Sequence, residues 1–243
     1  MKKEVNNNSF EGFYPETLKF LENLKNNNSK KWFDSHRDQY EQYLLDPVKK
    51  FVESIKGFIN YIDPQIIVEP KFNKSLVRLN KDMRFAKKPY KEYFLIRFGK
   101  FKWDCELFLY INSEVVSVGC FINNEKKQES RFHINVNTDI DKFYSVCEDY
   151  NIIKKYAVSD LMGNREVSAK FNPQKDTEKI LGIKWFTFEK NYSKDTKKIY
   201  SAKFIEDVIM AYNCLYPMYL YGTSVDIKKD IKEYRNKIGI LKK

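Results

Sequence analysis

Hydrophobic residues in the first sixty positions recur every three or four residues, which is the spacing of helices that bury one face. Three helices are therefore predicted. The first begins at Pro15 and ends at the asparagines of positions 26–28, and the second begins after Ser29, which can cap it. The third begins at Asp46-Pro47, and its apolar stripe consists of Val48, Phe51, Val52, Ile55, Phe58, Ile59 and Ile62.

Beyond position 65 the pattern changes to short runs rich in β-branched and aromatic residues. Strands are predicted at 94–98, 107–111, 115–122 and 183–188, with a turn at 112–114. Helices are predicted at 139–158, at 201–216 with an end near Pro217, and at 224–241, whereas 132–136 fits either element. Helices, then strands, then helices predict an α+β fold in which N-terminal helices pack on a largely antiparallel sheet and helices follow.

The chain has 243 residues, of which 42% are hydrophobic, so it can bury a substantial core. We expect a flexible N-terminus at 1–9, one α+β domain at 10–222 and an amphipathic helical extension at 223–243. The extension carries apolar residues at alternating spacings of four and three, namely Ile227, Ile231, Tyr234, Ile238 and Leu241. This stripe fits a helix docked on its own domain, and it also fits a homodimer contact through 224–241.

The chain is basic, with 44 Lys and Arg against 33 Asp and Glu and a net charge of +11. Such a balance favours polyanionic partners, although a general bias toward lysine and asparagine would produce it too. Neither a membrane-length apolar run nor a signal peptide is evident, so a cytoplasmic protein without a membrane partner is expected. Two histidines and four scattered cysteines predict no metal cluster, and eight glycines leave no glycine-rich phosphate loop.

The candidate chemistry lies in one cationic stretch, residues 71–100, which has a net charge of +8. If residues 78–84 are extended, Arg78, Asn80, Asp82 and Arg84 share one face, and Asp82 can orient the two guanidiniums toward a phosphate or carboxylate. The alternative is an Arg–Asp network that only closes a loop. The predicted anion-binding residues are Arg78, Asp82, Arg84, Lys88, Tyr90 and Lys91, joined by Arg37 and Arg97.

Two interpretations of Arg37 stay open. Its side chain reaches the same anion-binding pocket, or it lies on the surface and pairs with Glu41, four residues later on the same helix.

Three stretches of the chain carry a family resemblance. They are Gly12-Phe13-Tyr14-Pro15 leading into Trp32-Phe33 and on to Arg37 and Tyr40, then Arg84-Phe85 with Pro89-Tyr90-Lys91, and Phe204–Val208 leading to Pro217. Together they resemble the conserved hypothetical proteins catalogued as domain of unknown function 2461, over roughly residues 10–221. The resemblance implies an architecture and site positions, but no reaction.

The chain also departs from the family pattern. Lys81 stands where an arginine is usual, and only Lys170–Pro173 loosely matches the later basic segment.

The sequence leads to one main hypothesis and two alternatives. The main one is a cytoplasmic protein whose cleft binds a phosphorylated or carboxylated small molecule, or a nucleic-acid backbone. The first alternative is a non-catalytic module that binds protein or nucleic acid. The second is a metal-dependent phosphodiesterase, which requires carboxylates to meet near the arginines. The sequence names no cofactor and no catalytic residue.

Overall fold

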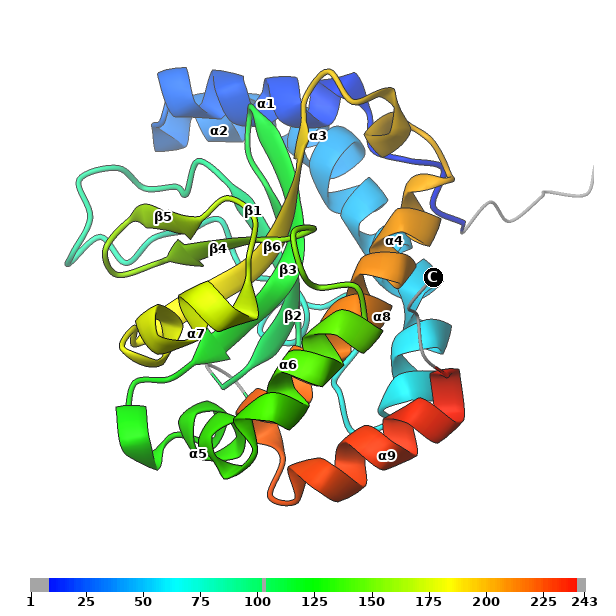
Figure 1. The fold of residues 1–243 in the computed structure, drawn as a ribbon. Helices are drawn as coiled ribbons and strands as arrows, with labels where there is room; N and C mark the ends of the chain where they lie inside the picture. The colour runs from blue at the N-terminus through cyan, green and yellow to red at the C-terminus, as the bar shows by residue number, and fades with distance from the viewer. Residues whose placement is uncertain (1–8, 102–103, 240–243) are drawn as a thin grey trace, which may run out of the picture. The chain divides into compact units, whose positions relative to one another are not determined.

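The computed structural model describes residues 9–101 and 104–239 (Figure 1). Its helices are α1 (Pro15–Asn26), α2 (Lys30–Ser35), α3 (Arg37–Tyr40), α4 (Asp46–Ile62), α5 (Arg131–Thr138), α6 (Ile140–Asp149), α7 (Pro173–Leu181), α8 (Phe204–Thr223) and α9 (Ile227–Ile238). Its strands are β1 (Phe94–Phe98), β2 (Glu106–Ile111), β3 (Val115–Asn123), β4 (Ala157–Asp160), β5 (Arg165–Ser168) and β6 (Trp185–Ser193). The fold class is α+β, as predicted.

Within the described residues the strands form one antiparallel sheet in the order β1-β2-β3-β6-β4-β5. The three strands predicted between 94 and 122 are confirmed with ends shifted by at most one residue. The predicted helix 139–158 is wrong in its second half, because α6 ends at Asp149. Asn151 and Lys154 then adopt positive φ, which breaks a helix, and the chain continues into β4, which pairs with β6.

The second and third predicted helices are not separated. A π-helical turn, Glu41–Leu45, joins α3 directly to α4, and Leu45 and Asp46 both keep helical backbone angles. Asp46 therefore does not cap a new helix, which corrects the predicted restart at Asp46-Pro47. Pro47 has no N–H to donate to the preceding turn, and the Tyr43 carbonyl, four residues earlier, instead accepts from the hydroxyl of Thr17.

The chain forms two compact units made of interleaved segments. The first consists of Met1–Ile96, Tyr110–Val116 and Tyr192–Asp207, and the second of Arg97–Leu109, Ser117–Asn191 and Val208–Lys243. The single domain predicted at 10–222 with its extension stays a prediction. The predicted flexible N-terminus lies outside the described residues except for Ser9.

An aromatic cluster occupies the core of the first unit. The ring of Phe13 lies 5.0 Å from that of Phe10 and 6.1 Å from that of Phe204, centroid to centroid. Gly12 precedes this cluster with a φ of 109°, and a Cβ there would lie 2.4 Å from the backbone nitrogen of Ser201. Only glycine fits, so the Gly-Phe pair places the start of the chain against the segment before α8.

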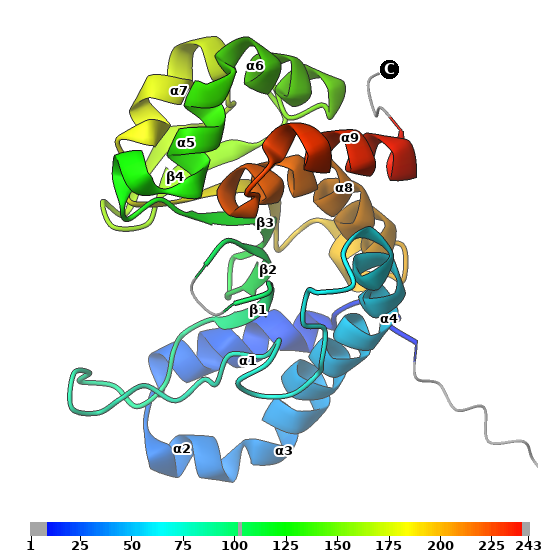
Figure 2. The same ribbon diagram turned by 90° about the horizontal axis from the view of Figure 1, so that it is seen from below.

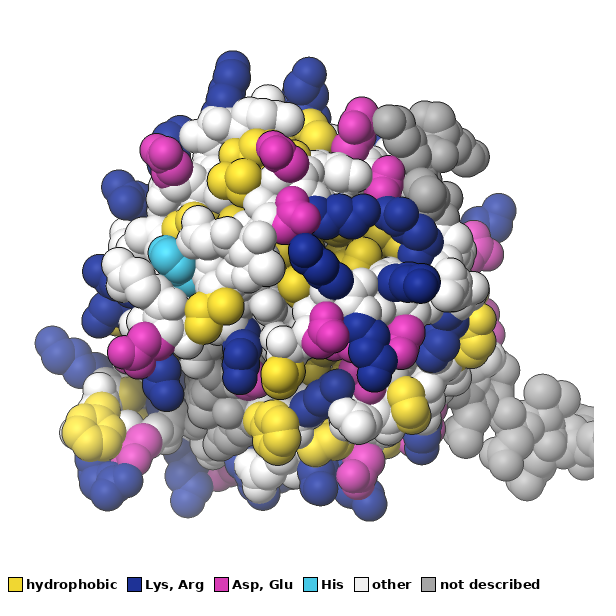
Figure 3. Space-filling model, turned by 60° about the horizontal axis from the view of Figure 1, so that its bottom comes forward, with side chains coloured by type: hydrophobic (Ala, Val, Ile, Leu, Met, Phe, Trp, Pro, Cys, Tyr) yellow, Lys and Arg dark blue, Asp and Glu magenta, His cyan; other side chains and the backbone are white. Residues whose placement is uncertain are grey.

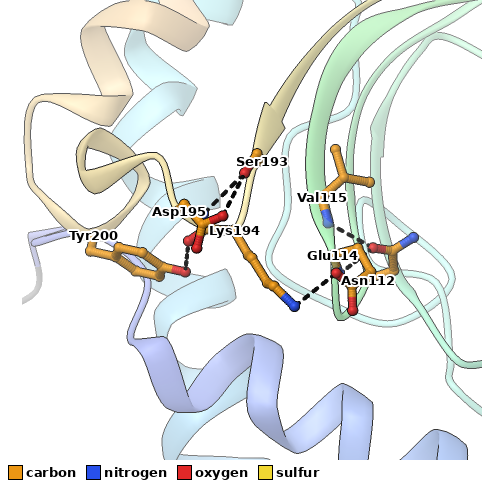
Figure 4. Close-up of polar contacts among 7 residues, drawn as sticks. All are labelled: Asn112, Glu114, Val115, Ser193, Lys194, Asp195 and Tyr200. Atoms are coloured by element: carbon orange, nitrogen blue, oxygen red, sulfur yellow. Dashed lines mark hydrogen bonds and ion pairs between the residues drawn. The ribbon is translucent and has the colours of Figure 1, made fainter.

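The turn between β2 and β3 is fixed to the segment that follows β6 (Figure 4). The Nζ of Lys194 lies 2.9 Å from a carboxylate oxygen of Glu114, and the backbone N–H of Lys194 donates to the Glu114 carbonyl. Asn112 accepts from the N–H groups of Glu114 and Val115, and Tyr200 donates to the Lys194 carbonyl. The predicted turn at 112–114 is therefore an ordered part of the first unit.

In the second unit, α8 does not end at Pro217 as predicted but continues to Thr223. A proline has no N–H, so the carbonyl four residues earlier, that of Asn213, lacks its helical donor. The hydroxyl of Tyr234 on α9 donates to this oxygen at 2.9 Å. A tertiary hydrogen bond thus replaces the helical one, which is why the helix passes through the proline.

Helix α9 is docked on residues of its own unit. Ile227, Ile231 and Tyr234 are buried, and Arg235 donates to the carboxylate of Asp149. Three residues of the predicted apolar stripe are thus buried within the chain, Ile238 is half-buried, and Leu241 lies outside the described residues. The homodimer through 224–241 stays a prediction. No helix within residues 9–101 and 104–239 combines the length and apolar character needed to cross a bilayer.

Candidate functional site

The stretch from residue 78 to residue 91 folds back on itself before β1 (Figure 2). Asn80 pairs with Tyr90 as an isolated antiparallel bridge, and the backbone N–H of Lys81 donates to the Pro89 carbonyl at 2.8 Å. The N–H of Lys91 donates to Leu79 at 2.8 Å. We call this stretch the 78–91 ribbon. Residues 78–81 and 89–91 form its base, and residues 82–88 form its tip.

Two side chains, those of Lys91 and Asn28, fix the base of the ribbon. The Nζ of Lys91 donates to the carbonyl oxygens of Arg78 at 2.6 Å and Asn80 at 2.9 Å. Asn28, in the asparagine run that ends α1, accepts from the backbone N–H of Tyr90 and donates its Nδ2 to the Tyr90 carbonyl. The asparagine run that was predicted to end the first helix thus also holds the ribbon in place.

A hollow of about 190 Å³ lies beside the base of the ribbon. Half of its lining residues are aromatic. The ring of Tyr90 stacks on that of Phe33 with centroids 4.3 Å apart, and the ring of Phe33 in turn contacts that of Tyr40 at 5.1 Å. The lining residues are Phe33, Arg37, Tyr40, Phe72, Arg78, Leu79, Asn80 and Tyr90. We call this site the arginine hollow.

Each arginine of the hollow lies over a phenyl ring that also lines it. The guanidinium carbon of Arg37 is 5.8 Å from the centroid of Phe33, and that of Arg78 is 5.3 Å from the centroid of Phe72. Arg37 also forms an exposed ion pair with Asp34 at 3.3 Å, not with Glu41 as one interpretation held. Among the described residues, Arg78 has no carboxylate partner.

The electrostatics of Tyr40 show that both guanidiniums act on the same point. Burial raises the pKa of Tyr40 to about 12, and Glu41 acts in the same direction, whereas the charges of Arg37 and Arg78 oppose the rise. Burial raises the pKa of Tyr90 too, with Asp34 adding to the rise and Arg37 opposing it. At neutral pH both tyrosines are therefore neutral hydrogen-bond donors, and the arginines supply the positive charge.

The structure places Asp82 and Arg84 at the tip of the ribbon, away from the lining of the hollow. The chain turns after Asp82, so the predicted row of four residues on one face extends only through Arg78 and Asn80. Arg84 donates its Nε and NH2 groups to the carboxylate of Asp82, and its side chain is 79% exposed. This pairing corresponds to the alternative in which the two residues close a loop.

The remaining predicted residues make separate contacts. Lys88 pairs with Glu92 at 2.8 Å, and Lys91 is committed to the two carbonyl groups of the base. Arg97, in the second unit, is buried and lies 3.6 Å from the equally buried carboxylate of Glu106. None of these three lines the hollow, whereas Arg37, Arg78 and Tyr90 do.

Sequence reasoning predicted Arg37, Arg78 and Tyr90 but missed other walls of the hollow. Phe33, Arg37 and Tyr40 are spaced by four and three residues, a signal that they share a helix face. Phe72 lies in an irregular segment and gives no comparable signal. Its place beside Arg78 depends on a turn, stabilised by the bridge between Phe72 and Leu76, that no periodicity marks.

Metal and thiol chemistry find little support in the described part of the chain. Within residues 9–101 and 104–239, no three His, Cys, Asp or Glu side chains are grouped so as to hold a metal ion. The four cysteines are free and buried, and burial raises the pKa of the Cys105 and Cys147 thiols. Such thiols are poor nucleophiles because the reactive thiolate is not populated.

Fold and site together define an α+β protein with two arginines at the edge of an aromatic-walled hollow. The sequence profile of the conserved hypothetical proteins of the DUF2461 family matches residues 16–221. The chain therefore belongs to this family. No curated protein matches it. All residues of the arginine hollow fall inside the matched range, whereas α9 follows it.

Proposed function

We propose that the protein binds the phosphate or carboxylate group of a small molecule in the arginine hollow. One observation carries the proposal: Arg37 and Arg78, which belong to different segments, line a single hollow that has no carboxylate among its lining residues. Two guanidiniums on one site match an anion with several oxygens, because each offers a planar set of donors.

The neighbouring groups support an anion more than a cation. Each guanidinium carbon lies over a phenyl ring. Arg37 donates one N–H to Asp34, whereas the N–H groups of Arg78 have no carboxylate partner among the described residues and stay available for a ligand. The side-chain amide of Asn80 has no hydrogen-bond partner among the described residues, and it offers a further neutral donor. The hollow is smaller than the ~300–1,000 Å³ of pockets for drug-sized ligands, so it fits one anionic group and a few further atoms.

The two arginines are not equivalent. Asp34 partly neutralises Arg37, whereas Arg78 has no such competitor among the described residues. The Lys91 contacts to the carbonyl groups of Arg78 and Asn80 fix the backbone that carries Arg78, which reduces the entropy lost on binding. Arg78 should therefore contribute more to anion affinity than Arg37.

Calorimetric titration with inorganic phosphate and with malonate tests the proposal. We expect binding by the wild type, a loss of about tenfold or more in Arg78→Gln, and a smaller loss in Arg37→Gln. Arg84→Gln is the matched control, since it removes the same charge from the same ribbon at its tip. Equal losses in all three variants would show general charge attraction, and no binding by the wild type would refute the site.

A second variant separates geometry from charge. Arg78→Lys keeps the positive charge but loses the planar fork, so it should bind phosphate more weakly than wild type if the fork is used. Thermal unfolding followed by circular dichroism checks that each variant is folded. Affinity that stays at the wild-type level in Arg78→Lys would limit the role of this residue to charge alone.

A further inference from the structure

A second hollow, of about 340 Å³, lies in the other unit and is built largely by α9. Helix α9 contributes Ile227, Ile231 and three cations, and Lys142 of α6 adds a fourth cation. We call this site the lysine hollow. Figure 3 shows it as a recess with hydrophobic atoms inside and Lys and Arg side chains around its edge.

The charges at the edge of the lysine hollow are only partly balanced. Arg235 is paired with Asp149, and Lys228 lies 3.8 Å from Asp139, the one acid among the lining residues. Lys142 and Lys232 have no ion-pair partner within the part of the chain that the structure describes. Two ammonium groups among the lining residues thus remain available for an anion.

The floor of the lysine hollow is apolar, in contrast to its charged edge. Ile227, Ile231 and Tyr221 line the recess, and most of the surface that the recess leaves accessible is apolar. A phosphate alone would leave this floor in contact with water, whereas a ligand with an aliphatic part would cover it. Removing apolar surface from water favours binding.

The recess is also held in shape before any ligand arrives. Asn135 donates its Nδ2 to the carbonyls of Tyr221 and Ser224, which fixes the connection between α8 and α9. The Ser224 hydroxyl donates to Asp230 of α9, and Asp226 caps the helix through the Lys229 N–H. A preformed site loses less entropy on binding than one that must be ordered.

We propose that the lysine hollow binds a small amphiphilic anion, with its phosphate or carboxylate at Lys142 and Lys232 and its aliphatic part on Ile227, Ile231 and Tyr221. The site is independent of the arginine hollow. Lys228, Lys232 and Arg235 follow residue 221, where the family match ends, so the site depends on the C-terminal helix of this chain.

Titration calorimetry with hexyl phosphate, butyl phosphate, inorganic phosphate and hexanol tests both halves of this proposal. We expect hexyl phosphate to bind most tightly, butyl phosphate more weakly, and the other two at least tenfold more weakly than hexyl phosphate. The double variant Lys142→Gln/Lys232→Gln should lose at least tenfold in affinity for hexyl phosphate. Lys229→Gln, on the same helix but outside the lining, should not.

Arg78→Gln separates the two sites, since it should leave hexyl phosphate binding to the lysine hollow unchanged. The proposal is overturned if hexyl phosphate fails to bind, if it binds no better than inorganic phosphate, or if the double lysine variant binds it as the wild type does. Circular dichroism melting shows that these surface variants keep the fold.

Discussion

The base and the tip of the 78–91 ribbon carry similar residues but place them in different surroundings. At the base, Arg78 lies over Phe72 at the edge of a hollow and Tyr90 is buried against Phe33. At the tip, Arg84 pairs with Asp82 two residues away, and Phe85 is 86% exposed. Arg78 is a candidate ligand-binding residue because distant segments meet around it. Arg84 is not, because a carboxylate two residues away already pairs with it.

The largest contrast between base and tip should appear in stability. Tyr90→Ala removes a ring that is 5% exposed and stacked on Phe33, so we expect the free energy of unfolding to fall by about 3 kcal/mol or more. Phe85→Ala, at the tip, should change it by less than about 0.5 kcal/mol. Urea unfolding measures both, and similar losses in the two variants would erase the distinction.

The second contrast concerns alkaline pH. The pKa of Tyr40 is raised to about 12 from 10, so in the folded state its neutral form is favoured. Stability is unaffected by this group below about pH 10 and falls as pH rises toward 12, by roughly 2–3 kcal/mol. Tyr40→Phe should flatten this decline in denaturant titrations at several pH values. Asp82→Asn at the tip should leave it unchanged, and an unaltered decline in Tyr40→Phe would contradict the assignment.

The smallest contrast concerns the lysines of the ribbon. Lys91→Met removes two hydrogen bonds to the carbonyls of the base, and we expect a loss of about 1 kcal/mol together with weaker phosphate binding at the arginine hollow. Lys88→Met, which breaks only an exposed pair with Glu92, should affect neither quantity measurably. Thermal melts and phosphate titrations of the two variants provide the comparison. Weaker binding in Lys88→Met would show that the tip takes part.

The elements with strong periodicity could be predicted from the sequence. The stripe from Val48 to Ile62 buries one face of α4, and the runs at 94–98, 107–111 and 115–122 became β1, β2 and β3. The strands β4 and β5 were missed because each has only four residues and neither sequence alternates apolar and polar residues. β5 pairs with β4, and β4 in turn pairs with β6, which lies later in the chain. Local patterns carry no signal of such a distant partner.

The site was predictable only in part for the same physical reason. Cationic density identified the stretch around Arg78 and Tyr90, and helix spacing drew attention to Arg37. The density of cations does not distinguish Arg78 from Arg84. The position of the turn in the ribbon decides which of the two arginines meets a second segment, and the sequence does not mark that position. The lysine hollow gave no signal of its own, since its free ammonium groups, on Lys142 and Lys232, come from helices ninety positions apart.

The hydrogen bond from Tyr234 to the Asn213 carbonyl has a practical consequence for shortening the protein. A chain trimmed to residues 16–221 would retain Pro217 but lack the hydroxyl that compensates for it, and Asp149 would lose Arg235. The aromatic side chain of Tyr216, which now contacts Tyr234, would also be uncovered. The length of chain that a family comparison recognises is therefore shorter than the length needed to complete this helix.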